Sequence, residues 1–298
     1  MKADLYVYAG SFAYEEGISE QDILKRLQTF KELTLKVDAS DNTFRVNFTE
    51  LFQTPISKNG MTIADAYEGK MEGSVAKTYQ QLIVNIFTSG TLKPETSSGQ
   101  EIDSLIGSHD QHSCKAKVVL SDKNIYDPEK HLIGTYDDWQ RFRVHFLGLY
   151  PINSDNFYNE CKKIFNNIIF SEKYKDATID VLESHSEKIA QGLLEVERFL
   201  INEFKGHKGS RINFPEIFAK NHSFDDGSFQ GSNQDKTTFE MEFPKIGKLN
   251  CEPHLKFNSP DDSKKNKPNI NIYCRFYFFM PTEARCDKVY IGAIVRHL

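Results

Sequence analysis

The chain has 298 residues, of which 39% are hydrophobic and 12% aromatic, a composition that excludes a disordered chain and allows a sizeable core. No stretch approaches the roughly 18 apolar residues of a membrane helix, and the first residues lack a signal-peptide pattern, so we expect a cytoplasmic protein without a membrane partner. The net charge is −5, yet residues 205–298 hold 15 Lys or Arg against 11 Asp or Glu, which indicates either a polyanion-facing part or ordinary surface variation.

Helix patterns dominate the first two thirds of the chain. Ser19 precedes the apolar positions of residues 19–33, and Asp22 follows three residues later, which is the capping-box arrangement. Thr62 and Asp65 repeat this arrangement further along. Both stretches are therefore predicted to be helices that begin at these capping residues.

Four further helices are expected from the same period, over residues 75–87, 137–150, 154–165 and 186–204. In the last of them the apolar side chains recur every three or four residues, at Ile189, Leu193, Val196, Leu200 and Phe204. This spacing gives the helix one apolar face, which belongs in a core.

Two short strands are expected among these helices. Residues 43–48 alternate between polar and apolar side chains, and residues 115–121 also have a strand-like pattern. The composition between them, over residues 92–113, turns to Pro, Ser, Gly and Gln, and residues 91–104 within this span are predicted to be an exposed loop.

The period changes to two beyond Gly206, which is the position where we expect a domain boundary, with domains of residues 1–206 and 207–298. Four strands are predicted there, over residues 237–244, 253–257, 269–279 and 288–298. Short connections favour an antiparallel meander with one face in the core. The expected fold class is therefore α+β, with a mixed, mainly helical N-terminal region followed by a C-terminal four-stranded antiparallel sheet.

The non-core face of this predicted sheet carries the residues with the richest chemistry. His254 and Lys256 alternate with two apolar side chains, and Arg275 and Tyr277 alternate in the same way on the next strand. The face also receives Glu240, Glu242, Tyr273, Arg296 and His297. The acidic and basic side chains of this face are either ordinary polar residues of a solvent-exposed sheet face or the residues of a site that binds phosphate.

Metal-independent cleavage of RNA needs a base for the 2′-hydroxyl, an acid for the leaving oxygen and cations for the phosphorane charge. We therefore hypothesise a ribonuclease site with no metal and no cofactor, in which the catalytic residues are His254, Lys256, Arg275, Tyr277 and His297. Tyr273 and Arg296 would bind the substrate, and Tyr277 would orient groups or stack on a base.

The segment from about 254 to 297 resembles the core sheet of RelE-type mRNA interferases, the ribonuclease toxins of bacterial toxin–antitoxin pairs. The resemblance lies in the alternating basic residues of one strand, an Arg on the next strand and basic residues close to the C-terminus. It implies RNA as the partner and a toxin-like activity. Members of that family are small single domains, whereas some two hundred residues precede the segment in this chain, which fits a larger effector in antiviral defence.

Two other clusters have alternative interpretations. His109, His112 and Cys114 offer zinc ligands, but a closed structural site needs four, so a solvent-exposed loop is the favoured interpretation. Arg141, Arg143 and His145 resemble the Arg-to-His motif of HEPN-type ribonucleases with a shorter spacing, and the aromatic neighbours favour ordinary core contacts. A nuclease of the PD-(D/E)xK type would need an acid two residues before Lys256, where this chain has His254.

The five cysteines are scattered and include no Cys-x-x-Cys pair, so we expect reduced thiols.

The rival function is a non-catalytic interaction subunit or regulator of a defence or toxin–antitoxin assembly, bound to a regulatory or inhibitory protein. In that case the Tyr and Arg side chains of the same face would be interface anchors.

Overall fold

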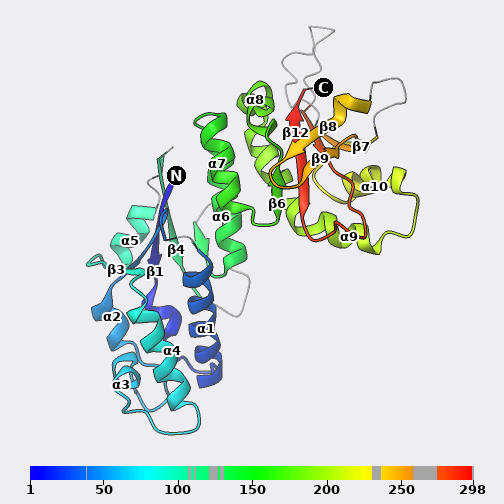
Figure 1. Cartoon of the computed structure of the whole chain (residues 1–298). Helices are drawn as coiled ribbons and strands as arrows, with labels where there is room; N and C mark the ends of the chain where they lie inside the picture. The colour runs from blue at the N-terminus through cyan, green and yellow to red at the C-terminus, as the bar shows by residue number, and fades with distance from the viewer. Residues whose placement is uncertain are drawn as a thin grey trace. The chain divides into compact units, whose positions relative to one another are not determined.

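The computed structural model of the chain describes residues 1–37, 39–106, 109–110, 112–120, 127, 131–229, 236–257 and 274–296. The chain divides into two compact units, Met1–Phe142 and Arg143–Leu298, each built on its own sheet (Figure 1). Gly206, where the pattern suggested a boundary, is the last residue of helix α9 (Ile201–Gly206) within the second unit. None of the helices in the described residues has both the length and the apolar character needed to cross a bilayer.

The first unit contains a five-stranded parallel sheet in the order β3-β2-β1-β4-β5. Its strands are β1 (Lys2–Val7), β2 (Asn42–Val46), β3 (Leu92–Pro94), β4 (Ser113–Val118) and β5 (Leu132–Ile133). The predicted α+β class is therefore wrong, because a parallel sheet with crossover helices makes this unit α/β.

The helices of this unit are α1 (Glu20–Lys36), α2 (Phe48–Gln53), α3 (Ile63–Tyr67), α4 (Ala76–Thr88), α5 (Gly99–Ile106) and the start of α6 (Tyr136–Leu149), together with a 3₁₀ turn, η1 (Ala9–Phe12). Both predicted capping boxes are confirmed. The Asp22 backbone N–H donates to Ser19 Oγ over 3.2 Å, and the Ser19 N–H donates to the Asp22 carboxylate over 2.9 Å. The loop predicted over residues 91–104 is wrong in part, because it contains β3 and most of α5.

The two faces of the parallel sheet differ in polarity. On β1, Leu5 and Val7 are buried on the face that packs against α1, where Phe30 contacts Phe44 at a ring-centroid distance of 5.9 Å. Tyr6 lies on the opposite face in a cluster with Ile102, Leu105 and Ile106 of α5. That face also carries the Asp4–Arg45 ion pair.

The second unit contains a mixed five-stranded sheet in the order β6-β12-β11-β10-β7. Its strands are β6 (Ile168–Phe170), β7 (Asp226–Ser228), β10 (His254–Phe257), β11 (Cys274–Phe278) and β12 (Val289–Val295). All pairs are antiparallel except β12 with β6. A four-stranded antiparallel sheet was therefore the wrong prediction.

The burial of β12 explains why the sheet has a fifth strand, β6, which pairs in parallel with β12. All seven of its residues are buried, so the strand needs cover on both faces and a partner on both edges. The first of the four predicted strands is not part of this sheet. Its residues form β8 (Glu240–Phe243), which pairs only with β9 (Gly247–Asn250) in a hairpin whose turn has a left-handed Lys245 with φ of 63°.

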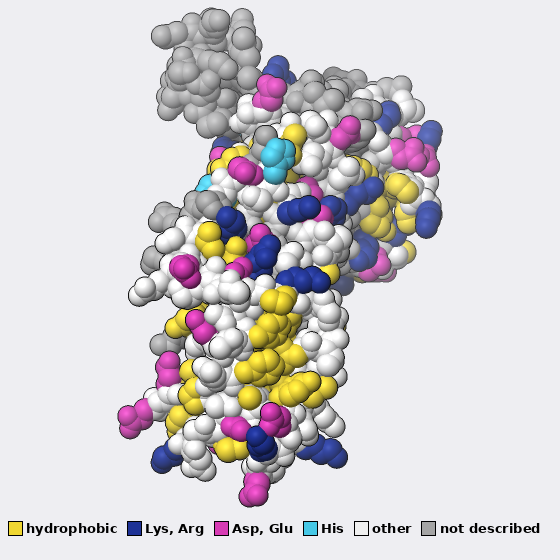
Figure 2. Space-filling model, turned by 90° about the vertical axis from the view of Figure 1, so that its left-hand side faces the viewer, with side chains coloured by type: hydrophobic (Ala, Val, Ile, Leu, Met, Phe, Trp, Pro, Cys, Tyr) yellow, Lys and Arg dark blue, Asp and Glu magenta, His cyan; other side chains and the backbone are white. Residues whose placement is uncertain are grey.

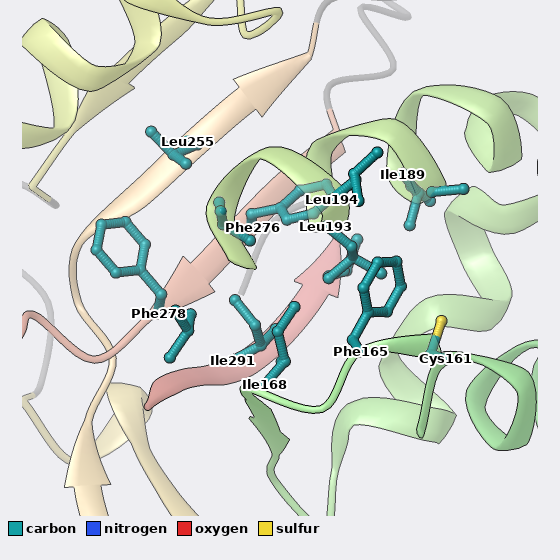
Figure 3. Packing of buried hydrophobic residues seen from close by; sticks show 14 of the residues in the cluster. Cys161, Phe165, Ile168, Ile189, Leu193, Leu194, Leu255, Phe276, Phe278 and Ile291 are labelled. Carbon is teal, nitrogen blue, oxygen red and sulfur yellow. The ribbon is translucent and has the colours of Figure 1, made fainter. Parts of the chain in front are cut away.

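The helices of the second unit are the rest of α6, then α7 (Ser154–Ile164), α8 (Tyr174–Glu195), a π-helical segment η2 (Val196–Leu200), α9 and α10 (Phe214–Asn221), with 3₁₀ turns η3 (Arg211–Asn213) and η4 (Lys236–Phe239). The apolar face predicted for residues 186–204 packs on the sheet. Leu193 and Leu194 lie against Phe276 of β11 and Ile291 of β12 (Figure 3).

The opposite face of this sheet is also covered in part. The β8–β9 hairpin contributes Met241 and Phe243 to a second buried cluster, which includes Tyr277 of β11 and Val295 of β12. The face that was expected to be wet is therefore largely covered over β11 and β12, and its polar side chains are those of β7 and β10 together with Arg275 of β11. Among the cysteines, four are buried and all five are free thiols.

Candidate functional site

Four of the residues proposed from the sequence lie side by side on β10 and β11. His254 is paired with Tyr277 and Lys256 with Arg275 in the strand register. The rings of His254 and Tyr277 have centroids 5.0 Å apart, and Arg275 Nη1 donates to Tyr277 Oη over 3.3 Å. The expected alternation is present, because Leu255 and the apolar residues beside it lie on the opposite face of the sheet, in the core cluster that includes residues of α8.

His254 is a buried, neutral imidazole. His254 is 2% exposed. Burial, together with the positive charges of Lys256 and Arg275, lowers the pKa of its imidazole to about 4. Nδ1 lies 3.2 Å from the Glu252 carbonyl oxygen, which can only accept, so Nδ1 carries the hydrogen. Nε2 is then the unprotonated nitrogen, 3.3 Å from Ser228 Oγ, whose hydroxyl can donate to it.

Lys256 has a carboxylate partner, Asp226 of the edge strand β7, with Nζ 2.8 Å from Oδ2. The pKa of Asp226 lies below its ordinary value. Burial acts to raise this pKa, but the hydrogen bonds from Lys256 and from the Gly227 N–H outweigh it. The pair is therefore charged at neutral pH.

Arg275 differs from Lys256, although the two are cross-strand neighbours. Among the described residues, its one side-chain hydrogen bond is to the hydroxyl of Tyr277, and no carboxylate reaches it within ion-pair distance. Its Nε is buried and has no hydrogen-bond partner. A half-buried guanidinium without a counter-charge is costly, so the site carries an unbalanced positive charge.

Tyr277 is not available to stack on a base. It is fully buried, and its ring lies 5.8 Å from that of Phe239 beneath the β8–β9 hairpin. Its hydroxyl instead orients the Arg275 guanidinium. Of the two roles considered for Tyr277, orientation of Arg275 is therefore the one that is compatible with its burial, and it stays a prediction.

The other proposed residues are placed differently. Arg296 is exposed and follows Val295, which belongs to the hairpin-side cluster, so alternation directs Arg296 to the α8 side of the sheet. Glu240 and Glu242 are exposed on β8. Tyr273 and His297 lie outside the described residues.

Sequence reasoning missed Asp226 and Ser228. They occupy a turn-rich run, and β7 has only three residues, so no strand period could show there. The signal is Gly227, where an added Cβ would lie 2.0 Å from the Pro215 carbonyl oxygen. Only glycine allows this close approach of β7 to α10.

The two alternative clusters have structural roles in the described residues. His109 and His131 place their ring centroids 5.2 Å apart, and no three His, Cys, Asp or Glu side chains of this part of the chain come together as a metal site. Arg143 is buried and donates to Glu160 over 2.5 Å, which joins α6 to α7.

Comparison with known proteins identifies no family for this chain. No protein-family model matches the chain, and no curated protein and no solved structure matches it either. The function is therefore inferred from the residues of the chain itself.

Proposed function

We propose that the C-terminal unit binds RNA through its phosphates and cleaves it without a metal ion, as a toxin-like or antiviral effector. The observation that carries this proposal is the uncompensated guanidinium of Arg275 beside Lys256. Like charges directly opposite each other in a sheet are destabilising. A phosphate would offset this cost, and the planar fork of an Arg side chain suits two phosphate oxygens.

The neighbouring His254 supplies the proton acceptor. In cleavage by the adjacent 2′-hydroxyl, its Nε2 takes the hydroxyl proton, the 2′-oxygen forms a bond to phosphorus, and the bond from phosphorus to the 5′-oxygen breaks. The leaving oxygen takes a proton from an acid, for which His297 is the candidate on sequence grounds. The products are a cyclic 2′,3′-phosphate and a free 5′-hydroxyl.

The substrate hydroxyl would take the place of the Ser228 hydroxyl, which lies beside Nε2 in the free protein. This exchange requires displacement of β7, an edge strand of three residues. A phosphate bound to Arg275 adds negative charge near the imidazole and raises the pKa of His254 from about 4 towards neutrality. The base is therefore strengthened when substrate is bound.

The test is incubation of the purified full chain with end-labelled RNA in the presence of EDTA. Cleavage should persist in EDTA and should be lost in Arg275→Ala and His254→Ala. Lys248→Ala, which removes an exposed cation from β9, is the matched control and should cleave normally. An Arg275→Ala protein that cleaves as fast as the parent, or cleavage abolished by EDTA, would refute the proposal.

A second function, binding of a regulatory or inhibitory protein, is favoured by an aromatic surface of the first unit. Figure 2 shows hydrophobic side chains gathered on this unit. Phe52 lies within 5.3–6.1 Å of the rings of Phe48, Tyr67 and Phe87, and Tyr67 is 40% exposed. If this surface binds a partner, Phe52→Asp should abolish co-purification of that partner and leave RNA cleavage intact. A partner retained by Phe52→Asp would exclude this surface.

A further inference from the structure

The other face of the same sheet also carries cations at the same end. Lys188 of α8 places Nζ 5.7 Å from the ring centroid of Phe257, the last residue of β10. Phe257 is paired with Cys274 at the start of β11. Arg296 follows the end of β12, next to these positions, since Val295 is paired with Arg275. Lys188 and Arg296 are therefore on the α8 side of the strand ends whose hairpin side carries Lys256 and Arg275.

A buried polar group lies beside these two cations. His185 precedes Lys188 by one helical turn on α8 and is 2% exposed. Its Nε2 has no hydrogen-bond partner among the residues that the structure describes. Burial lowers the pKa of His185, and the positive charges of Lys188 and Arg296 lower it further. Nδ1 lies 2.7 Å from Ser184 Oγ.

A buried nitrogen without a hydrogen-bond partner is energetically costly. An anion held between Lys188 and Arg296 would reduce this cost in two ways. Its negative charge would favour protonation of Nε2, and its oxygen would accept the resulting N–H.

We propose that His185, Lys188 and Arg296 form a second phosphate subsite, and that the ligand is a single-stranded RNA passing over the end of the sheet from one subsite to the other. This inference rests on the proposed function, because it assigns the class of RNA that the first site takes. The two subsites are on opposite faces of one sheet, so a stiff duplex cannot follow both. A flexible single strand can turn over the strand ends.

The experiment measures the binding of the full chain to single-stranded oligonucleotides by fluorescence anisotropy. The probes are a dinucleotide and a dodecanucleotide of the same composition, with a blunt duplex as a third. The variants are Lys188→Ala and Arg296→Ala for the second subsite, Arg275→Ala for the first, and Lys220→Ala as a control that removes an exposed cation of α10.

We expect Lys188→Ala and Arg296→Ala each to weaken binding of the dodecanucleotide about tenfold and to reduce the slope of log affinity against log salt by about 0.7, the value for one phosphate contact on a single strand. Binding of the dinucleotide should be unchanged. Arg275→Ala should weaken both, and Lys220→Ala should weaken neither.

The outcomes separate the two proposals. If Arg275→Ala weakens binding while Lys188→Ala and Arg296→Ala do not, or if they weaken both lengths equally, the second subsite is wrong and the first stands. A duplex that binds as tightly as the single strand also overturns the second subsite. If the parent chain binds no RNA, the proposed function itself fails.

Discussion

Arg45 in the first unit and Arg275 in the second occupy similar positions in two different sheets. Each lies within a strand, is half-buried, and is on the face opposite the α1 or α8 core. Arg45 donates to Asp4 of the adjacent strand over 2.9 Å, whereas among the described residues Arg275 reaches only the Tyr277 hydroxyl, at 3.3 Å. The first sheet thus supplies the counter-charge from its own strands, and the second leaves it to be supplied from outside.

The difference shows that a polar strand face is not by itself a functional sign. The corresponding face of β1, β2 and β4 alternates as clearly as the β10–β11 face, yet it carries the Asp4–Arg45 ion pair and a pair between Lys117 of β4 and Asp103 of α5 at 2.8 Å. What distinguishes the second unit is Arg275, a cation without a carboxylate partner in the part of the chain that the structure describes. Substitutions at charged positions of decreasing burial test this distinction.

Arg143 is the fully buried limit of the comparison. Glu160→Ala would leave its guanidinium buried without a carboxylate, and we expect a loss of about 3–5 kcal/mol in the free energy of unfolding of the second unit. Urea denaturation followed by circular dichroism measures this loss. The control is Glu216→Ala, which breaks an exposed pair with Lys220 and should cost less than about 1 kcal/mol. Equal losses in the two variants would contradict the argument.

The protonation of His254 should make the second unit sensitive to acid. Its folded-state pKa of about 4 lies below the ordinary 6.5, so between these values the unfolded chain binds more protons than the folded one. The stability is complete above about pH 6.5 and falls by about 3 kcal/mol as the pH falls to about 4.

Denaturant unfolding across this pH range is the measurement. His254→Gln should flatten the dependence, whereas His112→Gln, a substitution of an exposed histidine in the first unit, should not. A parent protein whose second unit is equally stable at both ends of the range would show that the imidazole is not held neutral. Bound RNA should also flatten the dependence, because phosphate raises the pKa of His254.

A matched pair of substitutions tests the comparison directly. Arg45→Ala leaves Asp4 without its partner and should cost about 1 kcal/mol of stability with no change in RNA binding. Arg275→Ala removes the positive charge opposite Lys256. It should change the free energy of unfolding by less than about 0.5 kcal/mol, yet weaken RNA binding at least tenfold. Thermal unfolding and anisotropy titrations of both variants distinguish these patterns. The reverse pattern would make Arg275 a structural residue.

Local features of this fold could be predicted from the sequence. The capping boxes at Ser19 and Thr62 depend on side chains three residues apart, and both helices begin there. The faces of β10 and β11 follow from alternation, which is why the sequence alone was enough to group His254, Lys256, Arg275 and Tyr277 on one face.

Strand neighbours could not be predicted in the same way, because they depend on contacts between distant segments. No strand was predicted over residues 2–7, yet β1 is the central strand of a parallel sheet with one polar face. The three-residue strands β6 and β7 are too short to have a period. The cover over Tyr277 comes from a hairpin whose first strand was expected within the sheet itself.

The smallest expected effect concerns the anion that the second unit does supply. Asp226 is half-exposed and Lys256 is paired with it across the sheet edge, so Asp226→Asn should cost less than about 1 kcal/mol of stability. The substitution removes a negative charge that competes with phosphate for Lys256. RNA affinity should therefore rise severalfold, and the salt dependence of binding should become steeper. An anisotropy titration over a series of salt concentrations decides the point. Weaker binding by Asp226→Asn would mean that the carboxylate positions Lys256 for the ligand and does not compete with it. In that case RNA would not displace Asp226, and its phosphate would serve as the counter-charge of Arg275 alone.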